Sequence, residues 1–328
     1  MKAIRVRDQG PPEVLVEEEM DDPRPGSGEV LVGLHAAGVN MIDVQQRSGG
    51  YSVRVPFTPG TEGAGEVIEI GRDVEPWTAG DRVAYAGVPG AYAELALVPA
   101  ERLVPVPSEI STHIAAAVLL QGMTAHYLLH SLVRLSDGEV VVVQAAAGGV
   151  GLLLTQMATA AGIHVIGTTS TDEKAALVRD AGAAEVVVRG RDDLAAVVAE
   201  RTKGAGARVV FDSVGQDTFD ASLGVLARRG CLALFGQSSG AVPPIDVSRL
   251  QKAGSVFLTR PGLADYVATR EELLHRADAV FSSVTTGRLD VRIHARYPLA
   301  RADQAHRAVQ SRTTAGKLIL VTDRGAGG

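Results

Sequence analysis

The sequence has 328 residues, of which 46% are hydrophobic and 21% charged, and its formal net charge is -6. This length suits two domains with sizeable cores, and the acidic balance without a basic block argues against nucleic acid or an anionic membrane as partner. The only cysteine, Cys231, lies in an apolar run, which excludes an intramolecular disulfide and indicates a buried structural thiol. Met1–Arg7 alternates like a strand and has no signal-peptide core, so we expect a cytoplasmic protein.

Short alternating segments bounded by glycine and proline fill the first third of the chain. They are Glu29–His35, Gly65–Gly71 and a shorter one that begins at Gly80 and ends at Ala84. Alternation with a period of two is typical of half-buried strands. This part of the sequence therefore predicts a small, mostly β domain.

Strands and helices alternate through the middle third. Strands are expected at 139–144, 164–168, 185–188, 208–212 and 231–235, and helices at 149–161, 172–181, 192–202 and 218–227. The continuous β-branched runs are typical of buried parallel strands. Repeated strand–helix alternation predicts right-handed βαβ units and a doubly wound parallel sheet.

The segment from Val140 to Gly167 contains no Asp, Glu, Lys or Arg and is long enough to span a bilayer. Its internal glycines and polar residues favour a strand, a turn and a helix over a membrane span. Further on we expect a last strand at 256–259, a long helix at 266–285, and a final strand at Lys317–Val321 that returns to the first domain.

The segment Ala146–Gly151 fits the dinucleotide-binding fingerprint, with alanine in place of the first glycine. In such a turn the middle glycine lets backbone N–H groups approach a pyrophosphate, and the last lets the helix lie close to the strand. The helix N-terminus then offers N–H donors to the phosphates. Because the motif lies between an expected strand and an expected helix, it predicts dinucleotide binding; a merely structural turn is the alternative.

The residues after the second strand favour NADPH over NADH. An NAD site wants an acidic residue near that strand's end, to accept a hydrogen bond from the ribose 2′-OH. Here Gly167–Thr171 carries hydroxyls, and Lys174 and Arg189 could bracket a 2′-phosphate. Asp172 and Glu173 complicate this interpretation, although acidic residues also suit the first turn of a helix.

Two other motifs indicate different chemistry but lack its context. Gly236–Gly240 matches the nucleophile elbow of hydrolases, yet two prolines follow where the elbow needs a helix. His126 and His130 have the spacing of zinc ligands on a helix, but the general-base glutamate after the first histidine is missing. We therefore expect neither a hydrolase nor a metal site.

Taken together, the ordered motifs resemble the zinc-independent quinone oxidoreductases, the zeta-crystallin-like family of the medium-chain dehydrogenase/reductase superfamily. The resemblance covers essentially the whole chain. The matching segments are Gly10–Leu15, Ala37–Asp43, Arg47–Tyr51, Pro59–Gly63, Gly80–Val83, Gly90–Glu94, Ala145–Gly151, Phe211–Gly215, Phe235–Gly240, Thr259–Pro261, Tyr297–Leu299 and Gly316–Lys317.

The resemblance implies an α/β fold in which a Rossmann domain is inserted in a β-rich, GroES-like catalytic domain. We expect the GroES-like domain at 1–122 and 262–328, the NADPH-binding Rossmann domain at 123–261, a cleft between them, and a homodimer. Zinc-dependent relatives place Cys and His ligands where this chain has Val39–Asn40 and Gly60–Glu62, and they carry a four-cysteine lobe. A chain with one cysteine fits the zinc-free branch.

The resemblance also assigns roles to individual residues. It implies that Asn40 lies near the nicotinamide. Our own hypothesis is that Asn40 and Tyr51 polarise the acceptor oxygen; a purely structural role for both is an open alternative. Some relatives have Tyr at the position of Gln45, which leaves the quinone pocket open. Some have Tyr at the position of Arg189, which changes an adenine or phosphate contact, although Arg can serve both by stacking and charge. The expected cofactor contacts are Asn40, Asp43, Thr124, Tyr127, Gly148, Gly149, Val150, Ser170, Lys174, Arg189, Ser213, Phe235, Gln237, Ser238, Arg312 and Lys317.

The function expected from this resemblance is hydride transfer from NADPH to a quinone in the cleft, without zinc. A reduced quinone oxygen is a stabilised anion, which fits the absence of an evident acid/base pair. Two alternatives stay open: reduction of activated C=C bonds in an enone or an enoyl thioester, and a non-catalytic NADPH-binding protein. The physiological acceptor and the one- or two-electron outcome are not set by the sequence.

Overall fold

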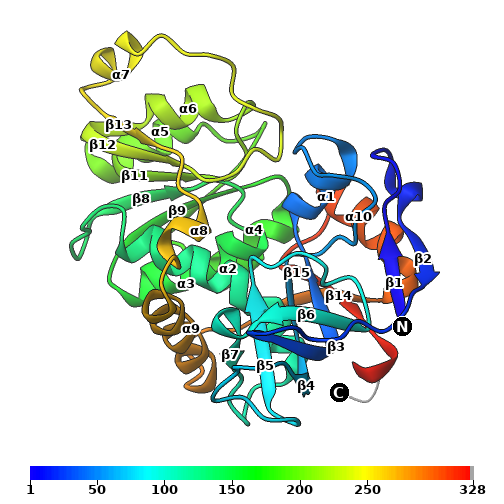
Figure 1. Cartoon of the computed structure of the whole chain (residues 1–328). Helices are drawn as coiled ribbons and strands as arrows, with labels where there is room; N and C mark the ends of the chain where they lie inside the picture. The colour runs from blue at the N-terminus through cyan, green and yellow to red at the C-terminus, as the bar shows by residue number, and fades with distance from the viewer. Residues whose placement is uncertain (326–328) are drawn as a thin grey trace. The chain divides into compact units, whose positions relative to one another are not determined.

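The structure, a computed structural model, describes residues 1–325, and the chain divides into two compact units (Figure 1). Among the described residues, the first unit contains 1–123, 267–287 and 291–325, and the second contains 124–266 and 288–290. The domain boundaries expected from the sequence were 122/123 and 261/262. Within residues 1–325, no helix is both long and apolar enough to cross a membrane.

The first unit is built on a largely antiparallel sheet. Strand β3 (Glu29–Val39) lies at its centre, because it pairs with β4 (Glu62–Ile70), β6 (Leu95–Pro99) and β15 (Lys317–Val321). The tail strand β15 thus returns to the first unit, as predicted. The sheet also contains β5 (Arg82–Ala86), β7 (Val104–Pro105) and β14 (Ile293–Pro298), whereas β1 (Lys2–Arg5) and β2 (Val16–Glu19) pair in a separate two-stranded sheet.

Apolar side chains from these strands and from the chain's last helix form the core of the first unit. Val32 and Leu34 of β3, Leu318 of β15, and Ala305 of α10 (Ala302–Gln310) belong to one buried cluster. The other helices of this unit are α1 (Met41–Ser48), α9 (Arg270–Thr285) and the first part of α2 (Thr112–His130). The predicted helix at 266–285 is wrong at its start, because Thr269 caps α9 and shares a capping box with Glu272.

A six-stranded parallel sheet forms the second unit, as predicted. Its spatial order is β10-β9-β8-β11-β12-β13, which is the 3-2-1-4-5-6 order of a doubly wound Rossmann sheet. The strands are β8 (Val140–Val143), β9 (His164–Thr169), β10 (Glu185–Val188), β11 (Ala207–Asp212), β12 (Leu226–Leu234) and β13 (Phe257–Thr259). The valine run of β8 is central and buried, because strands pair with it on both sides.

Helices cover both faces of this sheet (Figure 1): α3 and α4 lie on one face, α5 and α6 on the other. The helices of this unit are α3 (Gly149–Ala160), α4 (Asp172–Asp180), α5 (Leu194–Thr202), α6 (Phe219–Gly224), α7 (Ser248–Lys252) and α8 (Leu263–Tyr266). The predicted helix at 218–227 is too long. It ends at Gly224, and β12 begins at Leu226, whose side chain is buried in the sheet core.

Candidate functional site

The glycine turn joins β8 to α3 in the second unit. Gly148 is the N-cap of α3, and Gly149 and Val150 form the helix's first turn. A Cβ atom on Gly151 would lie 2.7 Å from Ala145 O and from Ala146 Cα, so only glycine fits where the helix crosses the strand end. The turn therefore has the backbone geometry that a dinucleotide pyrophosphate requires, with N–H groups of a helix N-terminus at its tip.

A buried hydrogen-bond network supports the turn from below. The Thr168 hydroxyl donates to Gln144 Oε1 at 2.7 Å, and Gln144 Nε2 donates to the Ser222 hydroxyl at 3.0 Å. Ser222 in turn donates to Asp212 Oδ2 at 2.7 Å. The chain of bonds links the ends of β8, β9 and β11 to α6, and Asp212 is fully buried. It fixes the carboxyl edge of the sheet, where this fold class binds ligands.

Positive side chains flank the end of β9. Thr171 caps α4 by accepting from the Lys174 N–H at 3.3 Å, and burial lowers the pKa of the Lys174 ammonium. Asp172, which complicated the case for NADPH, forms an ion pair with Arg191 at 2.6 Å. Arg189 is exposed, and its backbone N–H donates to Thr169 O at 2.9 Å. The ion pair with Arg191 offsets part of the Asp172 charge, which reduces its repulsion of a phosphate.

Arg189 also lines a pocket of about 370 Å³ at this edge of the sheet. Gln144 and Thr168 also line this pocket, as does Asp193, the N-cap of α5. Ser170 is exposed at the end of β9 but is not among the lining residues, and neither is Lys174. The structure thus brings Arg189 into this pocket and leaves the other two residues outside it.

The loop after β12 carries the remaining predicted contacts of this unit. Phe235, Gln237 and Ser238 are half-buried, and the Ser238 N–H donates to Ser213 O at 3.2 Å. Arg260 donates to Leu234 O at 2.8 Å, which ties the loop to the chain after β13. No helix follows Gly240 before α7 begins at Ser248, so the nucleophile-elbow context is absent from this described segment.

Thr124 and Tyr127 lie on α2, where the helix continues into the second unit. Both are buried; the Tyr127 ring stacks on Tyr266 with 4.3 Å between centroids, and its hydroxyl donates to Pro261 O at 3.5 Å. His126 and His130 lie on the same helix with ring centroids 4.7 Å apart. Within the described residues, no group of three or more His, Cys, Asp or Glu side chains could hold a metal ion.

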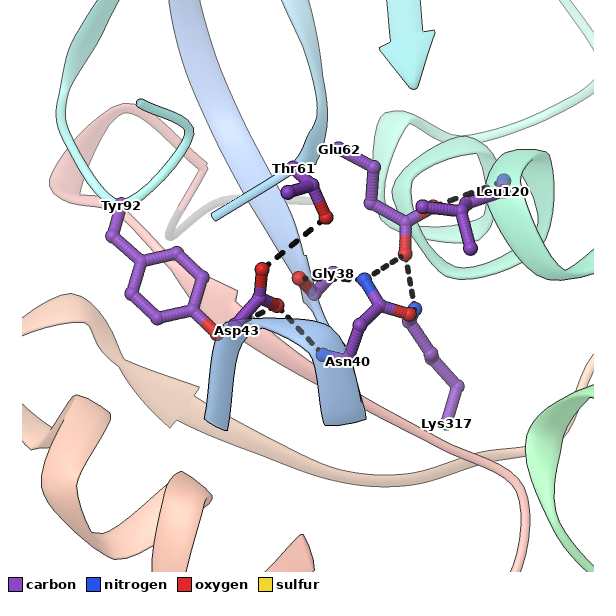
Figure 2. Close-up of polar contacts among 8 residues, drawn as sticks. All are labelled: Gly38, Asn40, Asp43, Thr61, Glu62, Tyr92, Leu120 and Lys317. Carbon is purple, nitrogen blue, oxygen red and sulfur yellow. Dashed lines mark hydrogen bonds and ion pairs between the residues drawn. The ribbon is translucent and has the colours of Figure 1, made fainter. Parts of the chain in front are cut away.

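In the first unit, Asn40 and Asp43 lie at the start of α1. Asn40 is the N-cap, and its backbone N–H donates to Asp43 Oδ2 at 2.8 Å, as in a capping box. The Asn40 side chain reaches across to β4 and β15 (Figure 2): Nδ2 donates to Glu62 Oε1 at 2.8 Å, and Oδ1 accepts from Lys317 Nζ at 2.8 Å. The local sequence therefore places an amide at a junction of three elements.

Glu62 is the centre of this junction. It forms a direct ion pair with Lys317, and the two side chains are 0% and 2% exposed. Its second oxygen, Oε2, accepts from the backbone N–H of Leu120 in α2 at 3.0 Å (Figure 2). A carboxylate buried this deeply is tolerated only with such partners, because desolvation of a lone charge is costly.

Asp43 joins a second buried set of polar groups. Thr61 Oγ1 donates to Asp43 Oδ1 at 3.2 Å, and the Tyr92 hydroxyl donates to Oδ2 at 3.3 Å (Figure 2). Burial raises the pKa of Asp43 to about 7, against the opposing effects of the Asn40 N–H and the Lys317 charge. His306 Nε2 lies 3.1 Å from the Tyr92 hydroxyl, and burial lowers the pKa of this imidazole to about 3, so His306 is neutral.

Of the other predicted residues of the first unit, Lys317 belongs to this cluster, whereas Tyr51 and Arg312 are exposed. Tyr51 follows α1 and is 38% exposed. Arg312 is exposed and has a φ of 57°. Lys317, expected at the cofactor, is 2% exposed, and its ammonium contacts Asn40 and Glu62. The cofactor contacts proposed for these residues stay predictions.

Sequence reasoning missed the roles of three residues of the buried cluster, Glu62, Tyr92 and His306, and it missed the pairing of Glu62 with Lys317. Glu62 and Tyr92 did appear in motifs of the family resemblance, but no role was assigned to them. Glu62 and Lys317 are 255 positions apart, so no local spacing connects them. The sequence offered one indication of this pairing. Glu62 and Lys317 each lie in a motif that matches the family, Pro59–Gly63 and Gly316–Lys317.

Comparison with known proteins covers nearly the whole chain. The model for the alcohol dehydrogenase GroES-like domain matches residues 26–108, and the model for zinc-binding dehydrogenases matches residues 149–284. A quinone oxidoreductase from Pseudomonas aeruginosa is 42% identical over 98% of this chain and 99% of its own length. A 2-haloacrylate reductase from a Burkholderia species is 38% identical over 97% of this chain and 98% of its own length.

Solved structures are also similar to this chain over nearly its whole length. The Escherichia coli quinone oxidoreductase complexed with NADPH has a TM-score of 0.96 and 40% identity, covering 98% of this chain and 100% of that one. A mycobacterial protein complexed with NADPH has a TM-score of 0.95 and 45% identity, with the same coverage. These similarities confirm the predicted combination of a GroES-like and a Rossmann domain. The chain therefore belongs to the quinone oxidoreductase family of the medium-chain dehydrogenase/reductase superfamily.

Proposed function

We propose that this oxidoreductase transfers a hydride from NADPH to a quinone. The observation that carries the proposal is full-length similarity, at 42% and 40% identity, to two bacterial quinone oxidoreductases. A related structure at 40% identity is complexed with NADPH. NADPH supplies the hydride, and the protein supplies binding, orientation and polarity.

The second unit fits such a dinucleotide. The close approach at Gly151 and the N–H groups at the start of α3 suit a pyrophosphate. Lys174 and Arg189 supply positive charge near the end of β9, while the ion pair with Arg191 compensates Asp172. These charges favour the 2′-phosphate of NADPH over the free ribose hydroxyl of NADH.

In the first unit, the Asn40 amide and the Tyr51 hydroxyl are the proposed donors to the acceptor oxygen. The proposed reaction needs no zinc. Asn40 and Thr61 stand where zinc-dependent relatives carry ligands, and the Lys317 ammonium contacts Asn40 directly. A cation at that position disfavours a metal ion by like-charge repulsion.

Reduction of an activated C=C bond is the second candidate function. The 38% identity to a 2-haloacrylate reductase, over nearly the full length of both chains, favours it. A double bond conjugated to a carbonyl or carboxylate accepts hydride at carbon and then needs a proton, so it places a greater demand on a nearby acid than a quinone does. A non-catalytic NADPH-binding protein is the third candidate.

Turnover assays separate these candidates. The full-length protein is mixed with NADPH and 1,2-naphthoquinone, an enone, or 2-chloroacrylate, and the loss of NADPH absorbance is followed. We expect the highest kcat/KM with the quinone. A higher value with the enone or the haloacrylate would favour the second function, and NADPH binding without turnover of any acceptor would favour the third.

Two variants test the proposed donors. We expect Asn40→Ala to lower kcat with the quinone roughly 10- to 100-fold, since a lost donor to developing negative charge typically costs this much or more. Tyr51→Phe is expected to lower it less, because Tyr51 is partly exposed to water. If both variants keep full quinone turnover, these roles are wrong.

A homodimer and a cytoplasmic location are part of the proposal. Strand β13 is the edge strand of the parallel sheet, and Phe257 on it is 65% exposed. An exposed apolar side chain on a free strand edge favours pairing with a second copy. Sedimentation velocity should show a dimer that Phe257→Arg converts to monomers; an unchanged sedimentation coefficient would contradict this interface.

A further inference from the structure

The Asn40 amide is held at both ends by groups of opposite charge (Figure 2). Its carbonyl oxygen accepts from the Lys317 ammonium at 2.8 Å, and its nitrogen donates to the Glu62 carboxylate at 2.8 Å. If the side-chain amide rotated so that Oδ1 and Nδ2 exchanged places, its N–H groups would face the Lys317 ammonium and its carbonyl oxygen would face the Glu62 carboxylate. Both contacts would then be repulsive. The ion pair therefore permits one orientation of an amide that is otherwise free to adopt two.

Burial makes this restraint strong. Asn40 is 7% exposed, and the two charged side chains are 2% and 0% exposed. Hydrogen bonds to charged partners gain strength where water is excluded, and linked bonds polarise one another. An ammonium on the carbonyl oxygen withdraws electrons from the amide, which makes its N–H groups better donors.

One amide hydrogen of Asn40 is held more weakly than the other. Nδ2 carries two hydrogens; it donates one to Glu62 Oε1 at 2.8 Å and the other to Gly38 O at 3.4 Å, a long hydrogen bond that an acceptor oxygen of a ligand can replace. The strength and direction of this second N–H as a donor depend on the ion pair, since Lys317 and Glu62 fix the plane of the Asn40 amide. Asn40 also has a small exposed area, whereas Glu62 has none.

We propose that Lys317 and Glu62 are positioning residues, which orient and polarise the Asn40 amide so that its second N–H donates to the acceptor oxygen. The proposal rests on the function proposed above. It gives Lys317 a role through Asn40 in place of the cofactor contact expected from the sequence. Neither side chain touches the substrate, and no proton or electron passes through them.

Kinetics of the full-length protein with NADPH and 1,2-naphthoquinone test the proposal. We expect Lys317→Met to lower kcat roughly 10- to 100-fold, while the Kd for NADPH stays within about twofold. If Lys317 contacted the cofactor directly, Lys317→Met would raise the Kd for NADPH and leave kcat unchanged, and that result would overturn the proposal. Lys2→Met is the matched control, because it removes an ion pair with Asp323 that is largely exposed.

A double-mutant comparison shows whether Lys317 acts through Asn40. In an Asn40→Ala background, Lys317→Met should cause little further loss of kcat, because the residue that it positions is already gone. Fully additive losses would mean that Lys317 acts independently of Asn40, contrary to the proposal.

A second variant separates positioning from folding. Lys317→Met alone leaves the Glu62 charge buried without its partner, whereas Glu62→Gln/Lys317→Met removes both charges. The double variant should regain much of the lost thermal stability yet keep a low kcat, since the amide then has neither the ammonium on its carbonyl oxygen nor a charged acceptor for its N–H. Recovery of wild-type kcat in this variant would overturn the proposal.

The orientation of Asn40 can also be read without turnover. In ¹H–¹⁵N spectra, the Asn40 side-chain resonance is identified by its loss in Asn40→Ala. We expect its two hydrogens to exchange slowly with solvent in the wild type and at least tenfold faster in Lys317→Met; equal rates would refute the proposed restraint. If the wild type reduces no acceptor, the function proposed above fails, while this measurement still decides whether the pair holds Asn40.

Discussion

Replacement of Asp43 by Asn should remove a pH dependence of stability from the first unit. Burial raises the pKa of Asp43 from 3.8 to about 7 in the folded protein. The folded state therefore holds more protons than the unfolded chain between about pH 4 and pH 7, and the free energy of unfolding falls as the pH rises through that window. At 1.36 kcal/mol for each pKa unit, the wild type loses on the order of 4 kcal/mol from this group.

Asparagine imitates the protonated acid in this site. Its carbonyl can accept from the Asn40 N–H and the Tyr92 hydroxyl, and its NH₂ group can donate to Thr61 Oγ1. The variant should therefore be about as stable as the wild type near pH 4. Above pH 7 it should be the more stable protein, by on the order of 4 kcal/mol from the same conversion.

Trp77 makes the measurement specific to this unit, because it is the only tryptophan of the chain and is buried in the core of the first unit. Urea unfolding followed by its fluorescence at pH 4, 5, 6, 7 and 8 gives the stability difference between variant and wild type. The exposed carboxylate Asp21 provides the control substitution Asp21→Asn. A difference that stays constant from pH 4 to pH 8 would refute the reasoning, since Asp43 would then carry no extra proton in the folded state.

The other predictions concern the second unit. Gly151→Ala should cost about 1–3 kcal/mol in thermal unfolding and weaken NADPH binding, because its Cβ would overlap backbone atoms at 2.7 Å. Gly224→Ala, a helical position with open space, should be neutral or slightly stabilising, and an equal loss would contradict the packing argument. Lys174→Ala and Arg189→Ala should each raise the Kd for NADPH about tenfold, because the loss of one charged hydrogen bond usually has an effect of this size. The Kd for NADH should stay nearly unchanged in both variants. Equal weakening for both cofactors in fluorescence titrations would rule out the 2′-phosphate assignment.

The sequence predicted the second unit well because the residue patterns that determine its strands, turns and helices are contiguous in the chain. The valine run of β8, the glycine turn and the helix after it are contiguous, and each imposes its structure within a few residues. The prediction was wrong where tertiary contacts override local preference. The helix at 218–227 gives way to β12 at Leu226, because that residue is needed in the core of the parallel sheet.

The candidate site of the first unit could be predicted only in part. Asn40 and Asp43 came from a contiguous motif, and the structure places both in the buried cluster. The roles of Glu62, Tyr92 and His306 could not be inferred in this way, because they depend on which distant strands meet. Lys317 shows the difficulty most clearly: the family resemblance assigned it to the cofactor, and its contacts with Asn40 and Glu62 depend on the return of β15 to the sheet of the first unit.

That pairing also has a consequence for synthesis of the chain. Strand β15 lies inside its sheet, between β14 and β3, so the sheet of the first unit remains open until residues 317–321 have left the ribosome. Every residue of the second unit, through Asp290, is made before that moment. The unit that begins the chain therefore closes last, and until then Glu62 lacks its cation. A nascent or truncated chain that stops short of Lys317 should expose the edge of β3 and offer a target to chaperones and proteases.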